Sequence, residues 1–147
     1  MTTTWILVAH RGGARLLANS GPGKGLQLVE TIPHPDGRLK DGDINADRPG
    51  RAFDIVGAGR HSMSKEQSQT ERIAEQFARM LVERLQQGRN ENRYSALVLA
   101  AEPRFLGALR AALDAPTAAL VTATLDKDLG GIETRDLAQH LAGTVKL

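Results

Sequence analysis

Three short apolar runs, far apart in the sequence, most constrain how this chain can fold. The run Trp5–Ala9 is wholly apolar, and apolar residues also dominate Tyr94–Ala101 and Ala118–Thr124. Strands of this kind are buried on both faces, as happens when helices cover both sides of a sheet. All three runs are therefore predicted to be buried strands, with Trp5–Ala9 at the centre of the sheet.

The beginning of the chain is typical of antiparallel strands. Turn signals at Arg11–Gly13 and Gly21–Gly25 separate the first apolar run from two more segments, Ala14–Ala18 and Leu26–Ile32. The second of these largely alternates apolar and polar side chains, as a half-buried strand does. Together the three segments predict an antiparallel meander.

Helical periodicity begins after residue 63. Ser64 and Gln67 fit a capping box, which predicts that a helix starts at Ser64 and extends to about Gln87, with Gly88 as its C′ residue. Residues 65–72 hold no large apolar side chain, so the first two turns are expected to project beyond the core. The predicted buried stripe consists of Ile73, Phe77, Met80, Leu81 and Leu85.

Two more helices complete the predicted order. Pro103 opens one of them, and Thr134 is predicted to cap the last, with His140 at the edge of the core. The order βββ, loop, α, β, α, β, α predicts a five-stranded mixed sheet with helices packed on it, in the α/β class. A length of 147 residues is that of one domain, residues 1–147.

Composition limits the setting of the protein. The 19 basic and 17 acidic residues give a formal net charge of +2, which is only mildly basic. There is no cysteine, which fits a reducing compartment. The apolar run near the start is too short for a signal peptide core or a membrane span. We therefore expect a cytoplasmic protein with no membrane partner, and the sequence does not specify an oligomeric state.

The segment 33–63 is the most unusual part of the sequence. It sustains neither strand nor helix periodicity, and loops of this length are usually functional or disordered. We predict a flexible loop whose arginines, together with the helix N-terminus that follows, bind an anion such as phosphate. The candidate partner-binding residues are Arg48, Arg51, Phe53, Gly57, Gly59, Arg60, His61 and Ser64.

No metal, cofactor or catalytic residue is predicted. Asp126 and Asp128 follow a predicted strand, but Lys127 lies between them and no third carboxylate accompanies them. His10 ends the first strand and could act as a general base, yet no nucleophile motif accompanies it. The glycines of Gly21–Gly25 do not have the spacing of a phosphate-binding P-loop.

The chain resembles the bacterial host attachment family, whose members are described as required for attachment to host cells. The resemblance covers nearly the whole chain, and Asp47–His61 is its most specific part. His10 stands where the first motif of the family has an aspartate. The segments that carry the resemblance are Trp5–Leu16, Pro35–Asp41, Asp47–Asp54, Gly57–His61, Pro103–Arg110 and Asp126–Leu129.

The order of elements is also similar to the middle domain of archaeal and eukaryotic peptide-chain release factors. That domain has an RNase H-like sheet, and a Gly-Gly-Gln loop lies just before its long helix. Here Gly57–His61 occupies the equivalent place without Gly-Gly-Gln. The resemblance therefore implies a loop directed at the ribosome or at transfer RNA, and it does not carry over peptidyl-tRNA hydrolysis.

Three hypotheses follow from the sequence. The first is a non-enzymatic host attachment protein whose loop contacts an anionic partner such as ribosomal or transfer RNA. The second is a hydrolase acting on an RNA-linked ester, with His61 or His10 assisting water. The third is a module that binds a protein partner and acts indirectly in cell attachment.

Overall fold

The computed structural model describes residues 3–10, 12–34 and 59–145, and every structural statement below concerns these residues. They form nine elements in the expected α/β class. The elements are β1 (Thr4–His10), β2 (Gly13–Asn19), β3 (Gln27–Pro33), α2 (Gly59–Asn90), β4 (Ala96–Ala100), α3 (Pro103–Ala112), α4 (Ala115–Ala118), β5 (Val121–Leu125) and α5 (Thr134–Leu141).

The predicted five-stranded mixed sheet is confirmed. Its strand order is β3-β2-β1-β4-β5, so the first apolar run lies at the centre. The strands β1, β2 and β3 pair antiparallel, as the predicted meander requires, while β4 and β5 run parallel to β1. The carboxyl ends of the three parallel strands therefore meet at one edge of the sheet, where α/β proteins commonly bind ligands.

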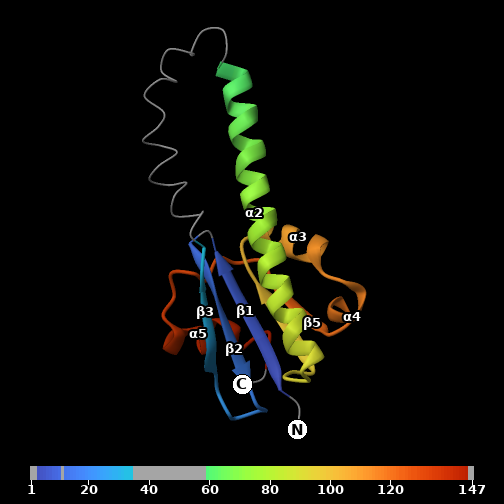
Figure 1. The fold of residues 1–147 in the computed structure, drawn as a ribbon. Helices are drawn as coiled ribbons and strands as arrows, with labels where there is room; N and C mark the ends of the chain where they lie inside the picture. Colours follow the sequence, from blue (N-terminus) through green and yellow to red (C-terminus); the bar gives the residue numbers. More distant parts are fainter. Residues whose placement is uncertain (1–2, 11, 35–58, 146–147) are drawn as a thin grey trace.

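The central strand β1 divides the core into two clusters. Trp5 and Leu7 pack on one face of the sheet with side chains from α2 and α3. Ile6 and Val8 pack on the other face with Leu137 and further residues of α5 and the loop before it. Figure 1 shows this layering, with α2 and α3 in front of the sheet and α5 behind it. The period of two in a strand explains why adjacent residues enter different clusters.

The helix α2 begins earlier and ends later than the capping signals indicate. It starts at Gly59, so Ser64 lies inside the helix and the predicted N-cap is wrong. A capping box contributes only about 1 kcal/mol, and no proline stops the helix from extending five residues towards the N-terminus. At the other end the helix passes Gly88 and ends at Asn90, and the left-handed φ of 57° is that of Asn92.

The predicted apolar stripe of α2 is confirmed, and it lies on the C-terminal part of the helix. Phe77, Leu81 and Leu85 are buried in the core. The N-terminal half of the helix extends well past the edge of the sheet (Figure 1), in agreement with the lack of large apolar residues in its first turns. The sheet thus fixes one end of α2 and leaves the other end projecting.

Three predicted details near the C-terminus differ from the structure. The strand expected at Ala118–Thr124 is β5, which starts at Val121, because a proline starts the short helix α4 before it. Its residues are mostly half-buried because β5 lies at an edge of the sheet. Thr134 is the first residue of α5, after the N-cap Glu133, and His140 is exposed.

Candidate functional site

The structure describes only half of the predicted partner-binding residues. Gly59, Arg60, His61 and Ser64 lie in the first two turns of α2, so they belong to the projecting end of this helix and not to a loop. The predicted loop 33–63 is therefore wrong over residues 59–63. The other predicted residues, Arg48, Arg51, Phe53 and Gly57, lie outside the described residues.

A groove lies between α2 and α3, next to the projecting end of α2 and at the carboxyl ends of β1 and β4. Its volume is about 1090 Å³. The floor is aromatic: His34 stacks on Phe77 with 4.0 Å between ring centroids, and Phe105 lies 5.7 Å from Phe77. His10, Glu102 and other polar residues form the rim. An apolar floor with a polar rim is the usual composition of a ligand-binding site.

The imidazole of His10 is held in one orientation. Its Nδ1 accepts a hydrogen bond from the backbone N–H of Gly12 at 3.1 Å. A Cβ at Gly130 would lie 2.3 Å from Cγ of His10, so only glycine fits beside the ring. Because Nδ1 is an acceptor here, the neutral ring carries its proton on Nε2.

Arg15 fixes the loop that brings Gly130 to His10. From β2, its guanidinium donates to Oγ1 of Thr134 at 3.1 Å, to the carbonyl of Leu129 at 2.9 Å and to that of Gly130 at 3.5 Å. Burial lowers the pKa of Arg15. Such a fork of donors needs the planar guanidinium group, and lysine could not replace it.

Two carboxylates of the groove stabilise local backbone. Glu102 accepts hydrogen bonds from the backbone N–H groups of Phe105 at 2.7 Å and Arg104 at 3.3 Å, so it is the N-cap of α3. Asp128 accepts from the backbone N–H of Gly130 at 2.9 Å. Both side chains hold backbone turns, which is an ordinary structural role for acidic residues at such positions.

Asp126 and Asp128 do not form part of a metal site with other residues of the described chain. Within residues 3–10, 12–34 and 59–145, no three His, Asp or Glu side chains are grouped to hold a metal ion. Among the helices described, none is both long and apolar enough to cross a membrane.

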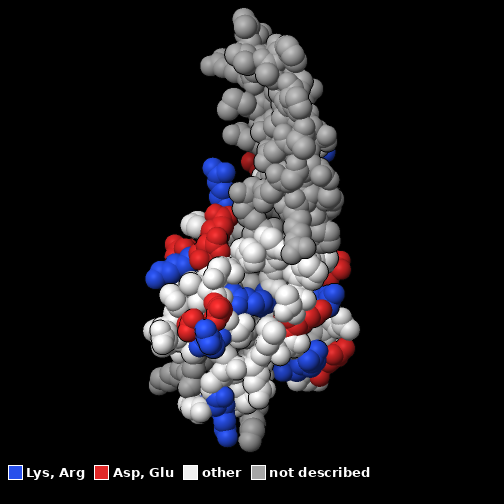
Figure 2. Space-filling view, turned by 90° about the vertical axis from the view of Figure 1, so that its left-hand side faces the viewer, with Lys and Arg blue, Asp and Glu red and all other residues white. Residues whose placement is uncertain are grey.

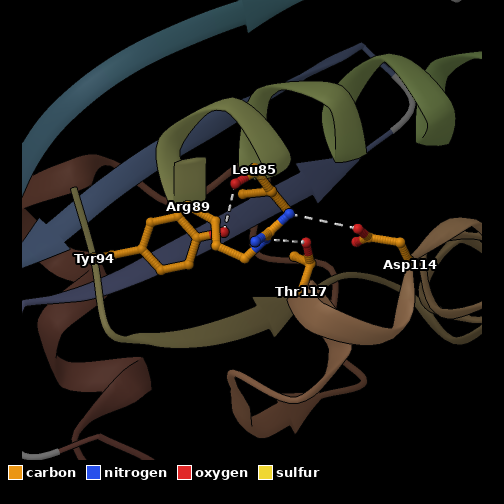
Figure 3. A network of polar contacts seen from close by, with 5 residues as sticks. All are labelled: Leu85, Arg89, Tyr94, Asp114 and Thr117. Atoms are coloured by element: carbon orange, nitrogen blue, oxygen red, sulfur yellow. Dashed lines mark hydrogen bonds and ion pairs between the residues drawn. The ribbon is translucent and has the colours of Figure 1, made fainter. Parts of the chain in front are cut away.

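Polar contacts at the C-terminal end of α2 anchor the projecting helix (Figure 3). Nε of Arg89 donates to Oγ1 of Thr117 at 3.1 Å, and the same guanidinium lies 3.7 Å from Asp114. Hydrogen bonding with Thr117 lowers the pKa of Asp114. The hydroxyl of Tyr94 donates to the carbonyl of Leu85 at 2.5 Å, and burial raises the pKa of Tyr94 to about 12.

The described surface carries mixed charges on the side where β3 and α5 lie. Basic and acidic side chains are interspersed over this face in Figure 2, with no large area of one sign among the residues coloured there. Arg84 and Glu30 form one such pair between α2 and β3. Exposed pairs of this kind contribute little to stability. Because the opposite charges are interspersed, the coloured residues of this face do not form a positive patch that would attract an anion.

Sequence reasoning missed the groove and three residues that shape it. His34 forms part of the aromatic floor. Gly130 lies against the ring of His10. Neither residue was singled out from the sequence. Arg15 did carry a signal, since in a strand it shares a face with the apolar Leu17 two residues later, and a charged side chain on a core face needs polar partners.

The fold defines a single-domain α/β protein with one long projecting helix and a groove beside it. The chain matches the family described as "Protein required for attachment to host cells" over residues 5–141, and it belongs to this host attachment family. The match confirms the resemblance to the host attachment family that was inferred from the sequence. No curated protein matches the chain.

Proposed function

We propose that the chain is a non-enzymatic binding protein that contacts an anionic partner, ribosomal or transfer RNA, through the segment Arg48 to His61 and the start of α2. The single observation that carries the proposal is the charge at the projecting end of this helix. Arg60 and His61 lie in its first turn, and that turn has no acidic residue.

The dipole of α2 favours an anion at this end of the helix. The N-terminus of a helix carries about half a positive charge and unpaired N–H donors, so acidic residues stabilise it and basic residues do not. Arg60 adds to the positive charge of this end of α2. A phosphate there would compensate the dipole and Arg60 together, and helix N-termini bind phosphate in many proteins. Arg48 and Arg51 add charge from the preceding segment.

The contacts of His10 support binding over hydrolysis. In the alternative function, His10 or His61 would assist water in cleaving an RNA-linked ester. In the structure, Nδ1 of His10 holds a backbone turn by accepting the N–H of Gly12, which is a structural role for this side chain. The resemblance to the release-factor middle domain adds the ribosome or transfer RNA as a target, and its catalytic Gly-Gly-Gln is absent from Gly57–His61.

A cytoplasmic location forms part of the proposal, and its support is the absence of cysteine. A cytoplasmic RNA-binding protein would influence attachment to host cells indirectly, through the synthesis of other proteins. A protein-binding module would also influence attachment to host cells indirectly. Recovery of RNA with the chain distinguishes RNA binding from protein binding.

The test is recovery of purified ribosomes and of transfer RNA on the immobilised full chain. We expect the variant with Arg48, Arg51 and Arg60 all changed to alanine to lose most of the RNA. The control changes Lys24, Arg110 and Arg135 to alanine, which removes the same charge from exposed positions elsewhere. It should retain RNA. Equal loss in both variants, or recovery unchanged by the first, would refute the proposal.

A further inference from the structure

The groove between α2 and α3 has the walls of a helix-binding site. Ile73 and Ala74 line it from α2. Ala108, Ala111 and Ala112 line it from α3, and these small side chains leave the space between the two helices open. At about 1090 Å³, the groove slightly exceeds the usual range for small-molecule pockets, about 300–1000 Å³, so it has room for a segment of chain.

The described residues of the groove rim are mainly acidic. Among them, Glu71, Glu75, Glu102 and Asp128 line the groove against two basic residues, Arg79 and Arg104, so the described acidic residues exceed the basic ones by two. Glu75 lies 3.9 Å from Arg79, and both are largely exposed. Glu71 and Glu75 are four apart on α2, where like charges repel each other. A cationic ligand would relieve this repulsion, while the phosphates of RNA would increase it.

We infer that this groove binds an amphipathic helix of a protein partner, with apolar residues along one stripe and Lys or Arg beside it. The apolar stripe would lie on Phe77, Phe105 and the alanines of α3, and its basic residues would face Glu71 and Glu75. A helix fits better than a strand because the edges of the sheet are β3 and β5, whereas the groove lies at the ends of the central strands. Helices commonly bind partners by this geometry.

The inference goes beyond RNA binding, since it concerns a separate surface of opposite charge and a different class of partner. The two surfaces are close together, because the groove lies directly below the projecting end of α2. A protein with both would connect an RNA to a basic protein segment. Neither site depends on the other, so a failure of one proposal leaves the other standing.

The test uses a library of helical peptides with randomised sequences, selected for binding to the full chain without nucleic acid. We expect the selected peptides to carry apolar residues at helical spacing with Lys or Arg beside them. Ala111→Arg, at an exposed position that lines the groove, should weaken their binding at least tenfold. Ala142→Arg is the matched control, since Ala142 is exposed at the end of α5, on the other face of the sheet.

Charge reversal gives a second, independent readout that does not depend on filling the groove. The double variant Glu71→Lys with Glu75→Lys should bind the selected basic peptides at least tenfold more weakly. It should gain affinity for versions of the same peptides with Glu in place of Lys. Glu83→Lys, at an exposed position of α2 away from the groove, should change neither affinity.

Three outcomes would overturn the inference. The first is a selection that yields no peptides with an apolar stripe and basic residues. The second is equal affinity of the selected peptides for wild type and for Ala111→Arg. The third is self-association of the chain in sedimentation experiments that Ala111→Arg abolishes, since the groove would then hold a second copy.

Discussion

At the scale of single residues, Gly88 shows how closely the core determines one side chain. It lies inside α2, where alanine would be favoured by helix propensity. A Cβ there, however, would lie 2.4 Å from Cη2 of Trp5 and 3.1 Å from the ring of Tyr94. These two rings stack on each other with centroids 4.6 Å apart, so they have little freedom to move away.

We predict that Gly88→Ala destabilises the protein by about 1–3 kcal/mol, the usual cost of overpacking a core. Gly107→Ala is the matched control in α3, because a Cβ at Gly107 meets no atom within 4 Å. That control should gain up to about 1 kcal/mol from helix propensity. Urea denaturation of both variants measures the difference, and equal effects would contradict the packing of Trp5 against Gly88.

Tyr94 gives a prediction about pH, and it is the only tyrosine in the chain. Burial raises its pKa from 10.0 to about 12 in the folded protein. The pKa in the folded protein lies above that in the unfolded chain, so the protonated hydroxyl contributes fully to stability below pH 10. This contribution is lost as the pH rises through about 12. Tyrosinate absorbance should therefore titrate about two units higher in the folded chain than in urea. A folded midpoint near the ordinary value would contradict the burial of this hydroxyl.

At the scale of secondary-structure elements, contacts at its C-terminal end keep α2 in place. Arg89 connects it to Thr117 of α4, and Thr117 is fully buried. Thr117→Val preserves the shape of the side chain but removes the acceptor, and the loss of a partly buried hydrogen bond costs about 0.5–1.5 kcal/mol. We expect a loss of stability of this size in thermal or urea unfolding.

Thr124→Val is the control for this element. Oγ1 of Thr124 also accepts a hydrogen bond from an arginine, Arg110, at 3.2 Å, but this contact is exposed. The control should change stability by less than about 0.5 kcal/mol. If both variants lose the same amount, the contact between α2 and α4 has no special role in holding the helix.

The sequence predicted best those elements whose apolar residues follow the regular pattern of a strand or a helix. The apolar run of β1 and the stripe of α2 gave the correct element, the correct face and the correct place in the sheet. The start of α2 was wrong because a capping box at Ser64 is a weak local preference, which the favourable extension of the helix outweighed. The burial of β5 was wrong because sequence alone did not place this strand at an edge.

At the scale of the whole molecule, the candidate sites lie together at one end, where the parallel strands end and α2 projects. The sequence predicted the projecting helix, because its first turns lack large apolar residues. It did not predict the groove, because Phe77, Phe105 and His34 meet only through tertiary packing. Neither composition nor net charge indicates that the described residues of the groove rim are mainly acidic while the first turn of α2 has no acidic residue.

The most direct test of this account is the salt dependence of transfer RNA binding by wild type and by Arg60→Ala, with Arg135→Ala as control. If Arg60 contacts a phosphate, the logarithm of the affinity falls linearly with the logarithm of salt concentration, and Arg60→Ala reduces the slope by about 1. Arg135 lies in α5, with its side chain 81% exposed, and its loss should leave the slope unchanged. An absence of RNA binding, or the same slope in wild type and Arg60→Ala, would contradict the assignment of the α2 N-terminus as an anion-binding end.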